Sequence, residues 1–106
     1  MSWVYLFAAG CLEIVWAVGL KYTEGFTKPV PTVVTLVAMA ASVGLLGLAL
    51  RHLPLGTAYA IWTGIGTVGT AVAGMIMLGE PSGALRLMCI GLIVAGILGL
   101  KLLTPA

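Results

Sequence analysis

The chain has 106 residues, of which 61% are hydrophobic and only 8% charged, and its net charge at pH 7 is +2. A soluble domain carries about 25% charged residues, so this composition excludes a soluble protein and indicates an integral membrane protein. We expect one transmembrane domain that spans residues 1–106. The small net charge and the lack of a basic run also argue against a nucleic-acid partner.

The first predicted membrane helix covers residues 2–20, an apolar run with one charged residue, Glu13. A helix rises ~1.5 Å per residue and the hydrocarbon core is ~30 Å thick, which places Glu13 near the middle of the membrane. A charge at that depth costs about 3 kcal/mol on insertion scales, so an acid retained there indicates a functional site. Because the segment lacks a basic flank and contains Glu13, we expect a retained helix rather than a signal peptide.

Three more apolar segments of membrane length follow, at residues 32–50, 57–78 and 85–103. Polar stretches that contain proline or glycine separate the four segments. Short loops join antiparallel neighbours. We therefore predict an all-α membrane protein whose four helices run alternately up and down.

Four side chains on the first three segments are candidates to share a site with Glu13. Trp16 lies one turn away, Ser42 is the only hydroxyl near the middle of the second segment, and Tyr59 and Trp62 share a face of the third. Each can donate a hydrogen bond to a carboxylate. For the aromatic residues the alternative is plain packing or an interfacial belt. Weaker candidates for the cavity lining are Gly10, Met39 and Thr63.

Small residues in the last two segments suggest a bend and a contact surface. Gly64 and Gly66 favour either close packing or a bend that lets the third helix change shape. Cys89 and Gly96 lie seven residues apart on one face of the fourth segment, which suits contact with a second copy. We expect Cys11 and Cys89 to be packing residues, because neither has a neighbouring metal ligand and both lie at membrane depth.

The remaining charges lie at or near the segment ends and give almost no orientation bias. The two sides carry Lys21, Lys28 and Arg86 against Arg51, Lys101 and the N-terminal amine. Both orientations can then occur, and two oppositely inserted copies would form an antiparallel homodimer with two Glu13 carboxylates facing one cavity. Two such carboxylates would titrate as a coupled pair.

Lys101 lies slightly inside the fourth segment. Its side chain either extends to the membrane interface or pairs with a loop acid such as Glu24.

Together these residues resemble the small multidrug resistance family of bacterial four-helix transporters, over essentially the whole chain. The resemblance rests on Glu13 and on the segments GLKYTEGFT (19–27), LPLGTAYAIWTGIG (53–66) and CIGLIVAGI (89–97). Trp16, Ser42 and the threonine-containing segment GTAYAIWTG (56–64) look like the guanidinium-exporter subtype. The family's small-residue heptad in the fourth helix is intact only if Cys89 serves as its first member.

The resemblance implies an antiparallel, dual-topology homodimer that performs proton-coupled antiport in the bacterial cell membrane. It implies that Glu13 binds substrate and protons, that Gly64 and Gly66 form the helix bend, and that four residues are hydrogen-bond partners of Glu13: Trp16, Ser42, Tyr59 and Trp62.

We therefore expect a transporter rather than an enzyme, without cofactor or metal, that exports guanidinium and small substituted guanidinium cations. Planar N–H donors pair side by side with a carboxylate, and aromatic rings add cation–π attraction. The first alternative is export of quaternary ammonium or polyaromatic cations by the same exchange at Glu13. The second is a non-transporting assembly subunit or half of a heterodimer. The near-zero orientation bias weighs against the heterodimer, because each half of one should have a fixed orientation. The expected partners are a second copy, a small organic cation, protons and the lipid bilayer.

Overall fold

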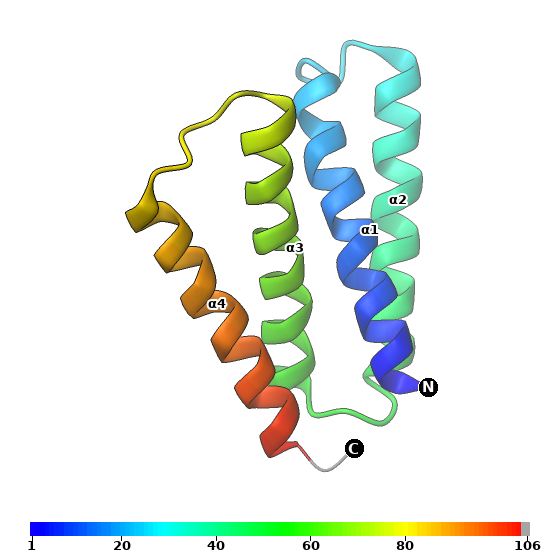
Figure 1. Cartoon of the computed structure of the whole chain (residues 1–106). Helices are drawn as coiled ribbons and strands as arrows, with labels where there is room; N and C mark the ends of the chain where they lie inside the picture. Colours follow the sequence, from blue (N-terminus) through cyan, green and yellow to red (C-terminus); the bar gives the residue numbers. More distant parts are fainter. Residues whose placement is uncertain (105–106) are drawn as a thin grey trace.

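The computed structural model describes residues 1–104, and this part of the chain consists of four helices that run in alternating directions (Figure 1). They are α1 (Ser2–Tyr22), α2 (Pro29–Ala49), α3 (Leu55–Met77) and α4 (Ala84–Leu103). Each helix is long and apolar enough to cross a membrane. The prediction of an all-α protein with four membrane-length helices is confirmed.

α2 and α3 begin two or more residues before the predicted segments, at or directly after a proline, which is tolerated at a helix start. α2 begins at Pro29, three residues before the predicted segment, so that Pro29 and Pro31 both lie in its first turn. The N–H that proline lacks would have no helical partner there. α3 begins at Leu55, and the carbonyl of the preceding Pro54 accepts the N–H of Ala58 at 2.9 Å.

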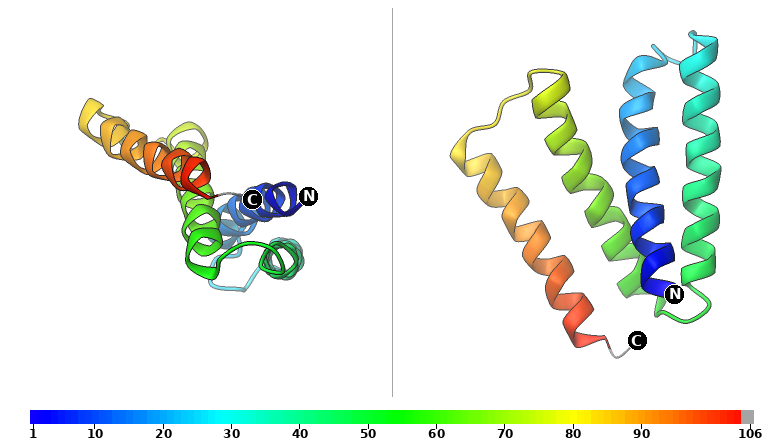
Figure 2. Two further views of the ribbon diagram at one scale, coloured as in Figure 1. Left: turned by 90° about the horizontal axis from the view of Figure 1, so that it is seen from below. Right: turned by 45° about the vertical axis from the view of Figure 1, so that its right-hand side comes forward.

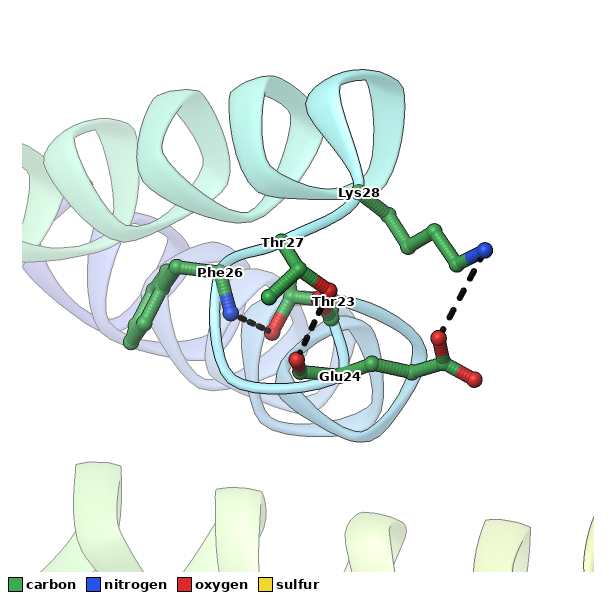
Figure 3. Close-up of polar contacts among 5 residues, drawn as sticks. All are labelled: Thr23, Glu24, Phe26, Thr27 and Lys28. Carbon is green, nitrogen blue, oxygen red and sulfur yellow. Dashed lines mark hydrogen bonds and ion pairs between the residues drawn. The ribbon is translucent and has the colours of Figure 1, made fainter.

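The α1–α2 loop is a tight turn held by its own side chains (Figure 3). The buried Thr23 hydroxyl accepts the backbone N–H of Phe26 at 3.2 Å. Thr27 donates to the carbonyl of Glu24 at 2.9 Å, and the Glu24 carboxylate lies 3.6 Å from the Lys28 ammonium. Glu24 and Phe26 have φ values of 48° and 68°, a region that favours glycine, so these contacts hold an otherwise disfavoured backbone.

The helices form a flat, open array rather than a closed bundle. The described chain measures 43 × 34 × 17 Å, and one helix with its side chains is about 10–12 Å across. α1 packs against both α2 and α3, whereas the backbone of α4 approaches only that of α3 (Figures 1 and 2). No residue of α4 is buried. Four helices of one copy therefore enclose little interior.

The apolar core lies in the half of the molecule that contains the chain's N-terminus. Its buried members come from α1, α2, the α2–α3 loop and α3, namely Leu6, Ala9, Leu46, Ala49, Leu53, Ala58 and Ile61. At the same end the Lys101 ammonium lies 5.0 Å from the centre of the Trp3 ring. Glu24 is in the loop at the opposite end (Figure 1), so the alternative of a Lys101–Glu24 salt bridge is wrong.

Candidate functional site

Glu13 lies near the middle of α1, and its side chain packs against Gly66 of α3. A Cβ atom added at Gly66 would overlap Cδ and Oε1 of Glu13. Because Gly66 has no side chain, the carboxylate rests directly on the backbone of α3. Within residues 1–104, the buried Oε1 atom has no hydrogen-bond partner. Buried polar atoms are almost always partnered, so this oxygen is available to a proton, a bound cation or a group from outside the chain.

Ser42 connects three helices about one turn from Glu13. Its fully buried hydroxyl donates to the carbonyl of Ala9 on α1 at 2.6 Å and accepts the indole N–H of Trp62 on α3 at 3.0 Å. Ala9 precedes Glu13 by four residues, so the same carbonyl is the helical acceptor of the Glu13 backbone N–H. In this single chain, Ser42 and Trp62 therefore bond to each other and brace the helix that carries Glu13.

The other two predicted partners, Trp16 and Tyr59, do not bond to Glu13 or to each other in the described residues. The indole N–H of Trp16 is buried and, among the described residues, has no acceptor. Tyr59 is 54% exposed, and its ring centre lies 5.6 Å from that of Trp62 with a tilt of 54° between the planes. Such tilted pairs are a favourable aromatic arrangement. Tyr59 and Trp62 therefore pair with each other, whereas the Trp16 indole N–H is left unpartnered within residues 1–104.

The residues predicted to line the cavity more weakly occupy different positions. Gly10 is buried against α3, where an added Cβ would lie 2.7 Å from Cγ2 of Ile65. Met39 on α2 and Thr63 on α3 are half-buried. Gly10 therefore allows α1 and α3 to pack closely, while the side chains of Met39 and Thr63 remain partly exposed.

The glycines predicted to form a bend lie within a continuous helix from Leu55 to Met77. Gly64 packs against α4, where an added Cβ would lie 2.8 Å from Cδ1 of Ile97, and Gly66 packs against Glu13. In this structure both glycines permit close contacts, and the bend stays a prediction. On α4, Cys89 and Gly96 are both exposed.

The sequence predicted neither the contact of Glu13 with Gly66 nor a role for Thr70. Thr70 lies four residues after Gly66 on the same face of α3, and its hydroxyl is buried without a partner in residues 1–104. The signal that could have found it is a hydroxyl at helical spacing from a glycine, inside an apolar segment. No group of three or more His, Cys, Asp or Glu side chains that could hold a metal ion occurs in the described part of the chain.

Comparison with known proteins gives concordant matches. A model of the Small Multidrug Resistance protein family matches residues 1–93. The guanidinium exporter of Citrobacter freundii is 58% identical over 104 residues, which cover 98% of this chain and 99% of that protein. The guanidinium exporter of Yersinia pestis is 58% identical over 102 residues, 96% of this chain and 98% of that protein. The relatives carry a transporter's name rather than that of an enzyme.

Proposed function

Because this chain belongs to the small multidrug resistance family, we propose that it is a proton-coupled antiporter that exports guanidinium and small substituted guanidinium cations. The four apolar helices and the family indicate a multi-pass protein of the bacterial inner membrane. The observation that carries the proposal is the Glu13 carboxylate at mid-membrane depth, with a buried oxygen that has no partner within residues 1–104. Relatives named guanidinium exporter at 58% identity support the choice of substrate.

The exchange at Glu13 follows from simple electrostatics. When ionised, the carboxylate attracts a planar cation whose parallel N–H groups match its two oxygens. Trp16, Tyr59 and Trp62 add cation–π attraction, and Ser42 positions the Trp62 indole. When protonated, Glu13 no longer holds the cation by charge. Proton and substrate therefore compete for one group, and transport requires no covalent step.

We also propose the roles of the remaining predicted residues. Trp16, Ser42, Tyr59 and Trp62 form the hydrogen-bonding and aromatic lining of the Glu13 cavity when a second copy encloses it. Gly10, Met39 and Thr63 line it more remotely. Gly64 and Gly66 allow α3 to bend during the exchange, because glycine leaves the helix backbone less restrained than other residues do.

The functional unit that we propose is an antiparallel homodimer. One copy is a thin array whose shortest dimension is 17 Å, so a cavity large enough for a cation beside Glu13 is proposed to form between two copies. α4 has no buried residue, and its small residues Cys89 and Gly96 are exposed. Small residues on one helix face favour helix association in membranes. The balanced charges at the two ends of the chain support opposite insertion of the two copies.

Cross-linking tests this dimer. Across a two-fold axis between antiparallel α4 helices, residue 89 of one copy faces residue 96 of the other. Oxidation of a Cys11→Ala, Gly96→Cys protein should therefore join most copies through positions 89 and 96, which a disulfide requires to be about 4.4–6.8 Å apart at Cα. The control is Cys11→Ala alone, which should remain uncross-linked. Efficient joining of residue 89 to residue 89 in this control would indicate parallel helices and contradict the proposal.

The proposed function is tested with the purified protein in liposomes that contain a pH-sensitive dye. An outward guanidinium gradient should drive proton uptake into the liposomes, whereas a matched gradient of a polyaromatic cation should drive little. Proton movement with the polyaromatic cation alone would instead support a multidrug exporter. No proton movement with either cation would refute proton-coupled antiport.

A further inference from the structure

Buried polar atoms without a hydrogen-bond partner gather on one side of Glu13. In the described residues they are Glu13 Oε1, Trp16 Nε1 and the hydroxyls of Thr32, Thr35 and Thr70. Apart from Glu13 itself, all lie between Glu13 and the end of the molecule that carries the α1–α2 loop (Figure 1). The opposite half holds the apolar core, and the buried Ser42 hydroxyl there has both an acceptor and a donor. Within residues 1–104, the buried side-chain atoms with unused hydrogen-bonding capacity are therefore Glu13 Oε1 and atoms on one side of it.

Thr70 is positioned to face Glu13 from this side. It follows Gly66 by four residues, which corresponds to ~6 Å along the axis of α3. The Cα–Cβ bond of a helical residue tilts toward the N-terminus, here toward Gly66 and the carboxylate that rests on it. The side chain of Ile14 packs against Gly69, so Thr70 lies beside the turn of α1 that follows Glu13. Both the Thr70 hydroxyl and Glu13 Oε1 are buried.

The hydroxyl of Thr70 does not make the bond that threonine usually makes inside a helix. A helical threonine often donates to the carbonyl four residues earlier. Thr67 does so, since its hydroxyl lies 2.7 Å from the carbonyl of Thr63. Thr70 has no such bond, although it is less exposed than Thr67. Its hydroxyl is thus left without a hydrogen-bond partner within residues 1–104.

We propose that Thr70 is a further substrate-binding residue of the Glu13 site, whose hydroxyl oxygen accepts an N–H from a guanidinium-type cation held by the carboxylate. This inference rests on the proposed export of such cations. A small planar cation with N–H groups on opposite edges can donate to a carboxylate on one side and to a hydroxyl oxygen on the other. A quaternary ammonium has no N–H to donate, so Thr70 also contributes to the selection of guanidinium.

The test is the dissociation constant of guanidinium, measured by calorimetry on the purified dimer. Thr70→Val keeps the branched shape, removes the hydroxyl and should raise Kd about tenfold, the effect of one lost hydrogen bond to a charged group. Thr70→Ser should restore binding to within about threefold of wild type. Thr67→Val, one turn earlier on the exposed side, is the matched control and should bind as wild type does. Thr70→Ala serves as the second hydroxyl-free variant if valine prevents assembly.

The outcomes separate this inference from the proposed function. If the wild-type protein binds guanidinium and Thr70→Val binds it with the same Kd, the proposed role of Thr70 is wrong, while the proposed function of the protein stands. Equal weakening by Thr67→Val, or no rescue by Thr70→Ser, also overturns the role of Thr70, because either result would indicate a general effect on α3. If the wild type neither binds nor transports guanidinium, the proposed function itself fails, and the role of Thr70 fails with it.

Discussion

Replacing Glu13 by glutamine should reduce guanidinium-driven proton movement to the leak of protein-free liposomes. Glutamine has nearly the same shape but neither ionises nor carries an exchangeable acidic proton, so it cannot hold a cation by charge. The same change should leave the free energy of unfolding within about 1 kcal/mol of wild type, because glutamine keeps the shape of the side chain and the helices stay in an apolar phase in both the folded and the SDS-unfolded state. Dye-loaded liposomes measure the first effect, and unfolding in mixed micelles with increasing SDS measures the second.

The matched control for this variant is Glu24→Gln. Glu24 is an exposed loop residue that pairs with Lys28 at 3.6 Å, and exposed pairs contribute only about 0–1 kcal/mol. Its replacement should leave both transport and stability close to wild type. Normal transport by Glu13→Gln would refute the mechanism, whereas a loss of transport in both variants would indicate a general sensitivity to charge removal.

Replacing Gly66 by alanine should lower the transport rate by at least about a hundredfold while the four helices still form. The added Cβ would overlap Cδ and Oε1 of Glu13, so the carboxylate must move away from α3. A displacement of roughly 1 Å at a reacting group costs about a hundredfold in rate. The same liposome assay measures the rate, and circular dichroism measures the helix content.

Gly44→Ala is the control for the alanine substitution itself. Gly44 also lies inside a membrane helix, but an added Cβ there meets no atom within 4 Å in the described chain. Alanine is favoured over glycine in helices by about 1 kcal/mol, so this variant should transport normally and be slightly more stable. Transport by Gly66→Ala at the wild-type rate would show that the contact between Gly66 and Glu13 is not required for transport.

The four membrane helices could be predicted from the sequence because an apolar chain in hydrocarbon must satisfy its backbone within each segment. Their starts were less predictable. Pro29 and Pro31 were placed in a loop, yet they lie in the first turn of α2, where a missing N–H is harmless. Proline therefore marks the neighbourhood of a helix start rather than the residue at which the helix begins.

The residues of the candidate site were nominated from the sequence, but their hydrogen-bond pairings could not be. Glu13, Trp16, Ser42, Tyr59 and Trp62 were singled out by residue type and spacing. The bonds from Ser42 to Ala9 and from Trp62 to Ser42 depend on the depth and rotation of three helices relative to one another. A helix that is apolar on nearly all sides gives no strong amphipathic signal for that rotation. For the same reason Gly66 was expected as a packing or bend residue but not as the surface on which Glu13 rests, and Thr70 was not expected at all.

By itself, the sequence determined that the chain is a membrane protein with four membrane-spanning helices. It also determined that Glu13 is the one charge at mid-membrane depth, which indicates a functional role. Both follow from the free energy of moving backbone and charge into hydrocarbon, which depends on composition and position along the chain. Only the tertiary structure decided that α1 packs against both α2 and α3, that Glu13 rests on Gly66, and that α4 remains unburied. These features depend on which helix faces meet, and close packing of glycines and small side chains decides that only after the helices have assembled.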